Sequence, residues 1–264
     1  MIRSLFFGTL FFITSFAFAQ EPPSAQWAKN NITVDGNPQD WNSLKHYDNQ
    51  TKLFFDFKND SNNLYLCFQT KDEMNQAKIM RSGMKIILSD KINGKHKSTI
   101  NFPLGVKHTS KSAESKDKIQ PDPLASHPSR HAAFLASDTM MEIKGFANKN
   151  GLISSNDMSA IHVAMNWDSA NTLTYEIAIP FKELFGNNYN LKDISDEISM
   201  NVIINPMPVS DLQTAGNRYS ERGENGSDGM EHGNRMEQYN RAALYQKTEL
   251  KQKFSLVTPD SNKN

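Results

Sequence analysis

Two glutamates are the first residues to weigh for catalysis, because both lie in strand-like segments. Glu142 belongs to residues 140–146 and Glu176 to residues 173–179. Two carboxylates about 5–9 Å apart are what glycoside hydrolysis requires, whereas carboxylates on strands usually face solvent. The chain has no Gly-x-Gly-x-x-Gly loop, no Walker pattern and no evident pairing of a nucleophile with a base. The sequence therefore favours binding over catalysis.

The tryptophans are the side chains best suited to recognise a small polar ligand. Trp167 ends a predicted strand and precedes the turn Asp168-Ser-Ala-Asn171. An indole at a sheet edge offers a flat apolar face to the C–H side of a sugar ring, and flanking Asp and Asn side chains hydrogen-bond its hydroxyls. We predict that Trp167, Asp168 and Asn171 contact a saccharide, with Trp27 as a further candidate. The alternative for Trp167 is a position that caps the core.

Oxygen ligands for a metal gather in one short loop. Asp35, Asn37 and Asp40 lie within six residues, and calcium binds six to eight oxygens. A turn held by hydrogen bonds from side chain to backbone needs no ion, so calcium stays open and no cofactor is predicted. A second group with the same two interpretations lies in a Gly-rich segment and comprises Asp228, Glu231 and His232.

The histidine and cysteine positions give weaker signals. His127 and His131 have a spacing of i, i+4, which on a helix would place both rings on one face. Pro128 and the surrounding Pro and Ser residues favour a loop instead. Cys67, the single cysteine, lies between two apolar residues and is expected to be a small buried side chain. One cysteine excludes a disulfide within the monomer.

The elements that must position these residues are mostly strands. Apolar and polar residues alternate with the period of two that a sheet buried on one face requires. Residues 59–63 and 168–171 have the composition of hairpin turns. The predicted strands cover residues 53–58, 64–70, 84–89, 97–102, 140–146, 160–167, 173–179, 198–204 and 250–257.

Helical signals are few. Asp72 has the right chemistry to cap a short helix that ends at Lys78. Pro180 suits the first position of a short helix that ends at residues 185–186. Residues 236–246 are the best candidate for a longer helix.

Two long polar segments interrupt the strands. Residues 105–138 contain three Pro and three His, and residues 214–233 contain five Gly with mixed charge. Long loops of this kind are either functional or disordered. We expect both to be the most mobile parts of the mature chain, because they have too few apolar residues to offset the entropy of ordering.

Two segments far apart in the chain carry short motifs in a recognisable order. The first reads Ile-Thr-Val-Asp-Gly-Asn-Pro-Gln-Asp-Trp over residues 32–41 and is followed by Asn-Leu-Tyr-Leu over residues 63–66. The second reads Leu-Thr-Tyr-Glu-Ile-Ala-Ile-Pro over residues 173–180. Together they resemble the family 9 carbohydrate-binding modules and the DOMON-like group. The resemblance implies one β-sandwich that binds an extracellular glycan, with the indole of Trp41 packed into the sandwich.

The same resemblance leaves a second function open. Some DOMON relatives bind b-type haem through Met and His or Lys, and here His162 with Met84, Met165 or Met200 would supply such ligands. Haem is therefore expected only if the protein is an electron-transfer module. A glycan-acting enzyme is the third alternative.

The N-terminus reads as a secretory signal over residues 1–19. Arg3 precedes an apolar run at residues 5–16, and Ala17-Phe-Ala19 is a small-x-small cleavage site. The run is too short for a membrane span, which needs about 20 residues, and no cysteine follows it for lipid attachment. We expect a soluble periplasmic or secreted protein.

The mature chain would form a single domain over residues 20–264. It would carry a net charge of −1, because the signal holds one of the 29 basic residues and no acidic residue. This near-neutral balance gives no reason to expect nucleic acid as a partner. We predict an all-β fold, an antiparallel jelly-roll-like sandwich, whose core contains Val34, Phe55, Phe57, Leu64, Leu66, Phe68, Ile177 and Ile179.

Overall fold

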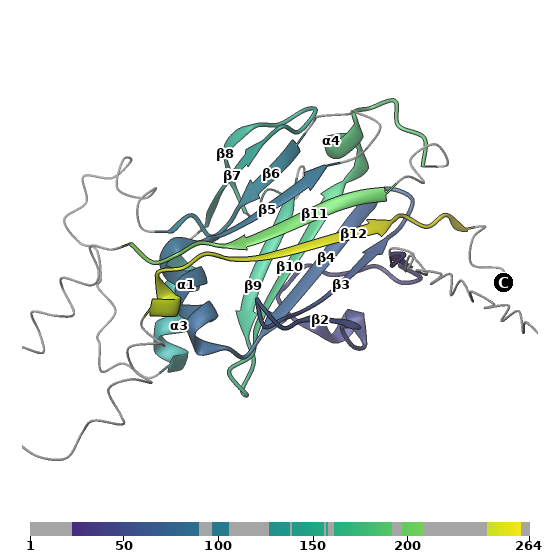
Figure 1. Cartoon of the computed structure of the whole chain (residues 1–264). Coiled ribbons are helices and arrows are strands. Elements are labelled where there is room, and N and C mark those ends of the chain that lie inside the picture. The colour runs from purple at the N-terminus through teal and green to yellow at the C-terminus, as the bar shows by residue number, and fades with distance from the viewer. Residues whose placement is uncertain are drawn as a thin grey trace, which may run out of the picture.

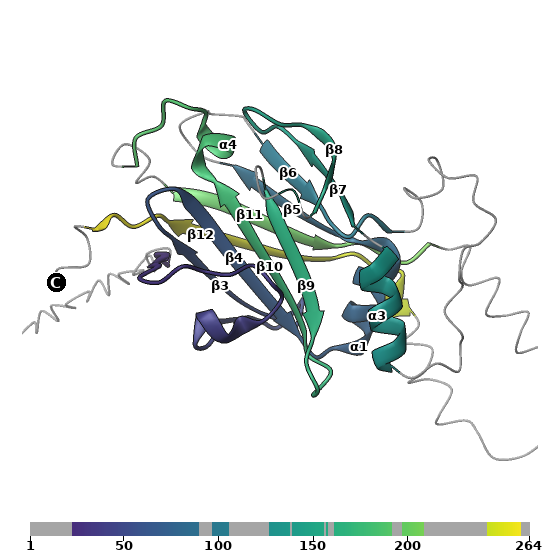
Figure 2. The same ribbon diagram turned by 180° about the vertical axis from the view of Figure 1, so that it is seen from behind.

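The computed structural model describes residues 23–89, 97–105, 127–137, 139–155, 157, 161–191, 197–208 and 242–259. In these residues two six-stranded sheets pack face to face as a β-sandwich (Figures 1 and 2). Several predictions lie outside the described residues: the signal peptide, residues 106–126 and 214–233 of the long loops, most of the helix expected at 236–246, and the group Asp228, Glu231 and His232.

Sheet one contains the motifs at residues 63–66 and 173–180, whereas residues 32–41 form a loop and a short 3-10 helix outside the strands. Its strand order is β1-β3-β4-β10-β9, and β2 also pairs with β3. All these pairings are antiparallel except that of β1 with β3. The strands are β1 Gln26–Trp27, β2 His46–Asp48, β3 Leu53–Asn59, β4 Asn63–Thr70, β9 His162–Trp167 and β10 Leu173–Pro180.

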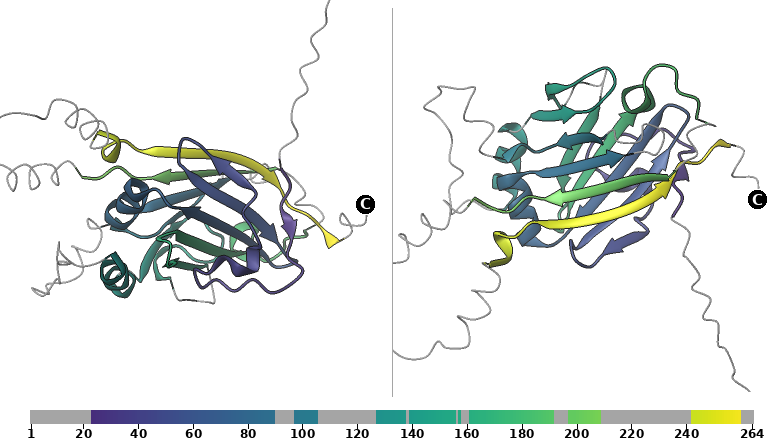
Figure 3. Two further views of the ribbon diagram at one scale, coloured as in Figure 1. Left: turned by 90° about the horizontal axis from the view of Figure 1, so that it is seen from below. Right: turned by 45° about the horizontal axis from the view of Figure 1, so that its top comes forward.

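Sheet two is antiparallel throughout, in the order β12-β11-β5-β6-β7-β8. Its strands cross those of sheet one at an angle, as Figure 3 shows. They are β5 Met84–Ser89, β6 Lys97–Asn101, β7 Met140–Lys144, β8 Gly151–Ser154, β11 Glu197–Ile204 and β12 Thr248–Ser255.

The predicted β-sandwich is confirmed, and each predicted strand has a counterpart. The three strands that the sequence analysis did not identify are β1, β2 and β8. They have two, three and four residues. A period of two is not recognisable over so short a run, so their pairing is decided by the neighbouring strands.

The interior between the sheets contains seven of the eight predicted core residues, all but Val34. Val34 is also buried, at 7% exposed, but it lies in the loop before Pro38 and in no strand. Phe57 is fully buried and stacks on Phe254 of the other sheet, with ring centroids 4.2 Å apart. This contact joins sheet one directly to sheet two.

Two of the short helices begin near the residues expected to start them. The side chain of Asp72 accepts a hydrogen bond from the Asn75 amide and caps α1, Glu73–Ser82, which runs past the predicted end at Lys78. Helix α4 spans Phe181–Phe185 and ends before Gly186. Pro180 is its N-cap residue, one position earlier than predicted.

Helix α3, His127–Ser137, corrects the expectation of a loop at these residues. Pro128 falls in the first turn, where the backbone amide has no partner within a helix and the fixed φ of proline is compatible with helical geometry. Phe134 and Leu135 then pack against the core. With α1, this helix covers one end of the sandwich (Figures 1 and 2).

The position of Trp41 also differs from the expectation. It ends a short 3-10 helix, Pro38–Trp41, and is 2% exposed. Its indole does not enter the space between the sheets but packs with Tyr65 and Cys67 in a separate apolar cluster. Tyr65 and Cys67 alternate with the inward-facing residues of β4, so this cluster lies on the outer face of sheet one, beneath the N-terminal segment. The predicted burial of Cys67 is confirmed.

Candidate functional site

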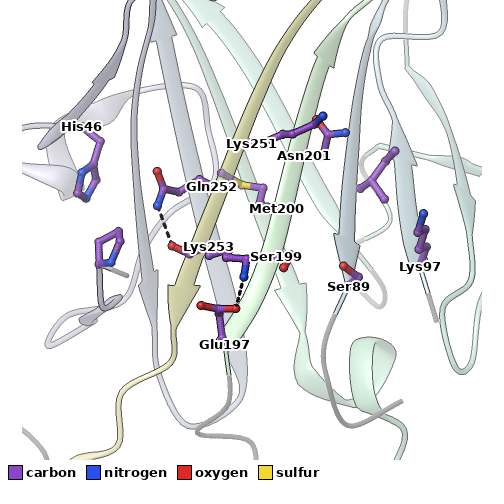
Figure 4. Close-up of a pocket in the computed structure, with 12 residues that line it drawn as sticks. His46, Ser89, Lys97, Glu197, Ser199, Met200, Asn201, Lys251, Gln252 and Lys253 are labelled. Carbon is purple, nitrogen blue, oxygen red and sulfur yellow. Dashed lines mark hydrogen bonds and ion pairs between the residues drawn. The ribbon is translucent and has the colours of Figure 1, made fainter. Parts of the chain in front are cut away.

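The outer face of sheet two carries a wide hollow with a volume of about 1090 Å³ (Figure 4). Its floor is formed by side chains that point away from the core on four adjacent strands. The hollow continues around the edge strand β12, where His46 of sheet one also lines it. The outward-facing lining residues are Ile87, Ser89, Lys97, Glu197, Ser199, Asn201, Lys251 and Lys253.

The register of the strands places small residues between lysines. Ser199 pairs with Lys253 on one side and with Ser89 on the other, and Ser89 pairs with Lys97. One row across the face therefore reads lysine, serine, serine, lysine. The short serine side chains leave the space that forms the hollow.

A smaller hollow of about 440 Å³ lies further along the same face. It shares Ile87 with the first and includes Lys85, Asn101, Glu142 and Lys144. The two hollows thus form a continuous polar surface across sheet two.

An exposed aromatic pair lies at the β2–β3 edge of sheet one, and we call Tyr47 and Phe54 the aromatic ledge. The two residues pair across the strands, their ring centroids are 4.6 Å apart and their planes are inclined by 41°. They are 51% and 47% exposed. Large aromatic side chains that stay half-exposed side by side are candidates for ligand contact.

Amide side chains continue the surface from the aromatic ledge along sheet one. Phe54 pairs with Gln69, which pairs with Thr174, and Thr174 pairs with Asn166. The Nε2 atom of Gln69 donates to the Thr174 hydroxyl at 3.0 Å, and Asn166 is exposed. On such a surface the aromatic rings can stack on the ring of a ligand, and the amide groups can hydrogen-bond the ligand's hydroxyls.

A charged pair borders the aromatic ledge. The Lys52 ammonium donates to the Asp72 carboxylate at 2.6 Å. The hydrogen bond and the charge of Asp72 raise the pKa of Lys52, and Tyr47 adds to this effect. Lys52 thus stays charged next to the aromatic pair.

Trp167, the first predicted contact, is half-buried beneath α3. The His131 ring stacks on its indole with centroids 4.1 Å apart and planes 12° apart, and Phe134 meets it edge-on. The indole Nε1 atom donates to Gln76 Oε1 of α1 at 3.0 Å. One face of the indole is therefore already covered by protein. Contact of Trp167 with a saccharide stays a prediction.

Of the other predicted contacts, Asp168 and Asn171 lie in one turn and Trp27 lies in a strand. Asp168 Oδ1 accepts from the amides of Ala170 and Thr172, so the carboxylate shapes the β9–β10 turn. Asn171 occupies the same turn with a φ of 59°. Trp27 lies in β1, partly exposed, at the opposite edge of sheet one from β9.

In the loop considered as a calcium site, the side-chain oxygens accept hydrogen bonds from the loop's own backbone amides. Asp40 accepts from the Thr33 amide, Asp35 from the Asn37 amide, and Asn37 from the Gln39 amide. Within the described ranges, no three His, Cys, Asp or Glu side chains come together as metal ligands would. A turn stabilised by side-chain hydrogen bonds accounts for these residues.

The proposed haem ligands do not share a face. Met165 points to the core, whereas His162 is three residues away on the same strand and therefore points outward. Met84 and Met200 are buried between the sheets. His162 cannot bind one haem iron together with any of these methionines, so the haem interpretation of these residues is wrong.

The two glutamates weighed for hydrolysis are also separated. Glu142 lies on the outer face of sheet two, where it pairs with Lys144 at 2.8 Å. Glu176 lies on the outer face of sheet one, so the whole core separates the two carboxylates. They cannot form a catalytic pair.

Glu176 instead links the two family-like motifs. Its carboxylate accepts from the Trp41 indole at 2.7 Å and from the amides of Gly36 and Asp35 at 2.7 and 3.1 Å. Complete burial raises the pKa of Glu176, while these three hydrogen bonds act in the opposite direction. Gly36 has a φ of 79°, and a Cβ there would lie 2.6 Å from the Asn166 Cβ. Only glycine fits at position 36, because any side chain there would clash with Asn166.

Sequence reasoning missed the aromatic ledge although a signal was present. Phe55 and Phe57 were assigned to the core, so the period of two turns Phe54 outward. A phenylalanine that faces solvent is unusual enough to mark a surface. Tyr47 gave no such signal, because β2 is too short to show a period.

The comparisons with known proteins identify no family profile and no curated protein that matches the chain. One similar solved structure is a family 9 carbohydrate-binding module from Caldicellulosiruptor kristjanssonii in complex with cellotriose. It is 10% identical, with 71% of this chain and 78% of that chain covered and a TM-score of 0.35. A second, from the same organism in complex with glucose, is 8% identical, with 92% and 100% covered and a TM-score of 0.38.

Both solved structures belong to the family that the sequence motifs resemble. At these identities and TM-scores the likeness assigns no ligand, so the residues of this chain must do so. None of the helices in the described ranges has the length and hydropathy of a membrane span.

Proposed function

We propose that this protein is a non-catalytic carbohydrate-binding protein that acts outside the cytoplasm. The observation that carries the proposal is the aromatic ledge, two half-exposed rings beside a row of amide side chains. In this proposal a saccharide docks on the open surface of sheet one at its β2–β3 edge.

The chemistry of the aromatic ledge suits a sugar ring. The C–H faces of a pyranose are apolar and can pack on the rings of Tyr47 and Phe54, while its hydroxyls need hydrogen-bonding partners at the rim. Gln69 and Asn166 provide amide groups in the same row, and Lys52 provides an ammonium group. Stacking of this kind needs no nucleophile and no general acid.

The N-terminal sequence supports the proposed place of action. Residues 1–19 have the charge, apolar run and cleavage site of a signal peptide. We infer an exported protein that acts in the periplasm or outside the cell. Detection of a mature N-terminus at Gln20 by mass spectrometry would support export, and retention of residues 1–19 in the purified protein would contradict it.

A glycan array followed by calorimetric titration tests the proposal. Phe54→Ala and Tyr47→Ala should each weaken saccharide affinity by about 10-fold, because each removes one stacking contact. The melting temperature should change little, since both rings are half-exposed. Leu152→Ala is the matched control, because Leu152 is an equally exposed apolar side chain on the other sheet.

Two outcomes would count against the proposal. One is the absence of binding by the wild-type protein to any neutral glycan at millimolar concentration. The other is wild-type affinity in both aromatic variants. Trp167→Ala tests the alternative contact, and we expect it to lower stability because His131 and Gln76 lose their partner.

A further inference from the structure

The outer face of sheet two differs chemically from the aromatic ledge on sheet one. Its strands turn five lysines and three glutamates outward, and the described lining of its hollow contains no tryptophan, tyrosine or phenylalanine. The lysines are Lys85, Lys97, Lys144, Lys251 and Lys253, and the glutamates are Glu142, Glu197 and Glu249.

The glutamates lie low on this face and the lysines extend above them. Glu197, Glu249 and Glu142 have side chains that are only 17%, 21% and 23% exposed. Their lysine partners are 62%, 74% and 65% exposed, at distances of 2.8, 3.6 and 2.8 Å. An approaching ligand therefore meets ammonium groups first.

Asparagine side chains on neighbouring strands fix two of these glutamates close to the sheet. Asn201 donates to Glu249 at 2.6 Å, and Asn101 donates to Glu142 at 2.8 Å. In Glu142 one oxygen accepts from the amide and the other pairs with Lys144. In Glu249 the Oε1 atom contacts both Asn201 and Lys251, and Oε2 pairs with Lys247. Within the described part of the chain, Lys97 and Lys85 have no acidic partner, so their charge is not neutralised locally.

The spacing of the lysines leaves room for an extended ligand. Lys251 and Lys253 on β12 lie three strands from Lys97 on β6, which corresponds to about 14 Å. Between them the floor presents the hydroxyls of Ser89 and Ser199 and the amide of Asn201. Figure 4 shows this floor between Lys251 and Lys253 on one side and Lys97 on the other.

We propose that this lysine-rimmed hollow binds an acidic polysaccharide. The ammonium groups would pair with carboxylates of uronic acid residues, and the floor would hydrogen-bond the ring hydroxyls. The site lies on the opposite outer face from the aromatic ledge and does not depend on saccharide binding there.

Other anionic partners fit this face less well. Single-stranded nucleic acid is held by aromatic stacking combined with a strongly positive groove, and the described hollow has neither large aromatic side chains nor a net charge beyond a few units. A polymer with at most one carboxylate per sugar matches sparse lysines better. Its hydroxyls also match the serine and asparagine floor.

The probe is polygalacturonate, with its fully methyl-esterified form as the matched neutral ligand. In calorimetric titration at low salt, the wild-type protein should bind polygalacturonate and should not bind the ester detectably. Raising NaCl from about 20 mM to about 500 mM should abolish most of the binding, because exposed charges are screened over a few ångströms at high salt. Equal binding of the ester would overturn the inference.

Paired variants locate the site. Lys97→Gln/Lys251→Gln should weaken polygalacturonate binding by about 5-fold or more. Lys29→Gln/Lys182→Gln makes the same change of net charge at exposed positions outside the hollow and should leave the affinity unchanged. Equal losses in both double variants would show non-specific attraction and would refute the site.

The same titrations separate this inference from the proposed function. The double variant Tyr47→Ala/Phe54→Ala should still bind polygalacturonate but should no longer bind neutral saccharides. If the wild type binds neutral glycans but no polygalacturonate, the inference fails and the proposed function stands. If polygalacturonate binding is lost in the aromatic variant, the acidic polymer occupies the aromatic ledge and the hollow is not its site.

Discussion

At the scale of single residues, Glu176 explains why two distant sequence motifs occur together. The carboxylate is the shared acceptor for the loop that contains Asp35 and Gly36 and for the indole of Trp41. Without it the Gly36 amide and the indole N–H would be buried without partners, and the part-buried Asp35 amide would lose its acceptor. The glutamate of one motif therefore fixes the conformation of the other.

Removal of this acceptor should be costly. Glu176→Ala leaves two buried donors and one part-buried donor unpaired, so we expect a loss of about 2–4 kcal/mol in the free energy of unfolding. Trp41→Phe removes one hydrogen bond and should cost about 1 kcal/mol. Glu142→Ala is the control, because a partly exposed carboxylate in a surface ion pair contributes less than about 1 kcal/mol. Urea denaturation measures all three, and equal effects for Glu176→Ala and Glu142→Ala would contradict this interpretation.

His162 should give the stability a specific pH dependence. Burial lowers the pKa of His162 below its ordinary value of 6.5, so the unfolded chain takes up a proton more readily than the folded one. The contribution of neutral His162 to folding stability is complete above pH 6.5 and is lost as the pH falls through the pKa of His162 in the folded protein. Relative to His162→Gln, the wild type should therefore lose stability on acidification, by less than about 1.4 kcal/mol per pH unit. Denaturant melts across this range measure the difference, and an NMR titration with a pKa above 6.5 would contradict it.

At the scale of elements, strand β3 shows how one short run serves two surfaces. Its residues alternate between the core and the outer face, so Phe57 stacks on Phe254 of sheet two while Phe54 pairs with Tyr47 in the aromatic ledge. The same residue type contributes packing at one position and an exposed ring at the other. The pleat of the strand decides which role each phenylalanine has.

Two substitutions on β3 test this division. Phe57→Ala should lower the free energy of unfolding by about 3–5 kcal/mol, because Phe57 is fully buried. Phe54→Ala on the same strand should cost less than about 1 kcal/mol, since that ring is half-exposed. Denaturant melts compare the two directly. Similar losses would mean that the outward orientation of Phe54 is wrong.

At the scale of the whole molecule, the N-terminal segment joins the two sheets. β1 pairs with β3 in sheet one, and just before it the amide of Ala25 donates to the Ser255 carbonyl at the end of β12. The Ser255 amide in turn donates to the Pro23 carbonyl. Ala25 itself is buried in the core. A few residues thus connect both sheets at one edge of the sandwich.

A chain that begins at Ala28 should therefore be less stable than one that begins at Gln20. It loses the hydrogen bonds between the sheets and the contact of Gln26 with the buried Asp56 carboxylate. We expect a decrease of about 2–3 kcal/mol in the free energy of unfolding. The chain from Gln20 should match the one that retains residues 1–19, which serves as the control. Equal melts for the Ala28 and Gln20 chains would show that the N-terminal connection contributes nothing.

The sequence by itself determined the fold class, most strands and most of the core. Alternation over six to eight residues carries this information, because one face of each strand must be buried and the other must not. The cap at Asp72 could also be predicted from the sequence, because it depends on residues only a few positions apart. Local patterns could not identify α3, where the proline and serine content outweighed the apolar contacts that Phe134 and Leu135 make with distant strands.

Only the tertiary structure decided which polar and aromatic residues meet. Glu142 and Glu176 have similar sequence surroundings, yet they lie on opposite outer faces because their strands belong to different sheets. Tyr47 and Phe54 are brought together by the pairing of β2 with β3, and the lysine rows by the pairing of β12, β11, β5 and β6. Strand order pairs segments far apart in the chain, such as Ser89 of β5 with Ser199 of β11. Spacing along the chain contains no direct record of that order, because the partners of each strand are chosen by the packing of the whole sandwich.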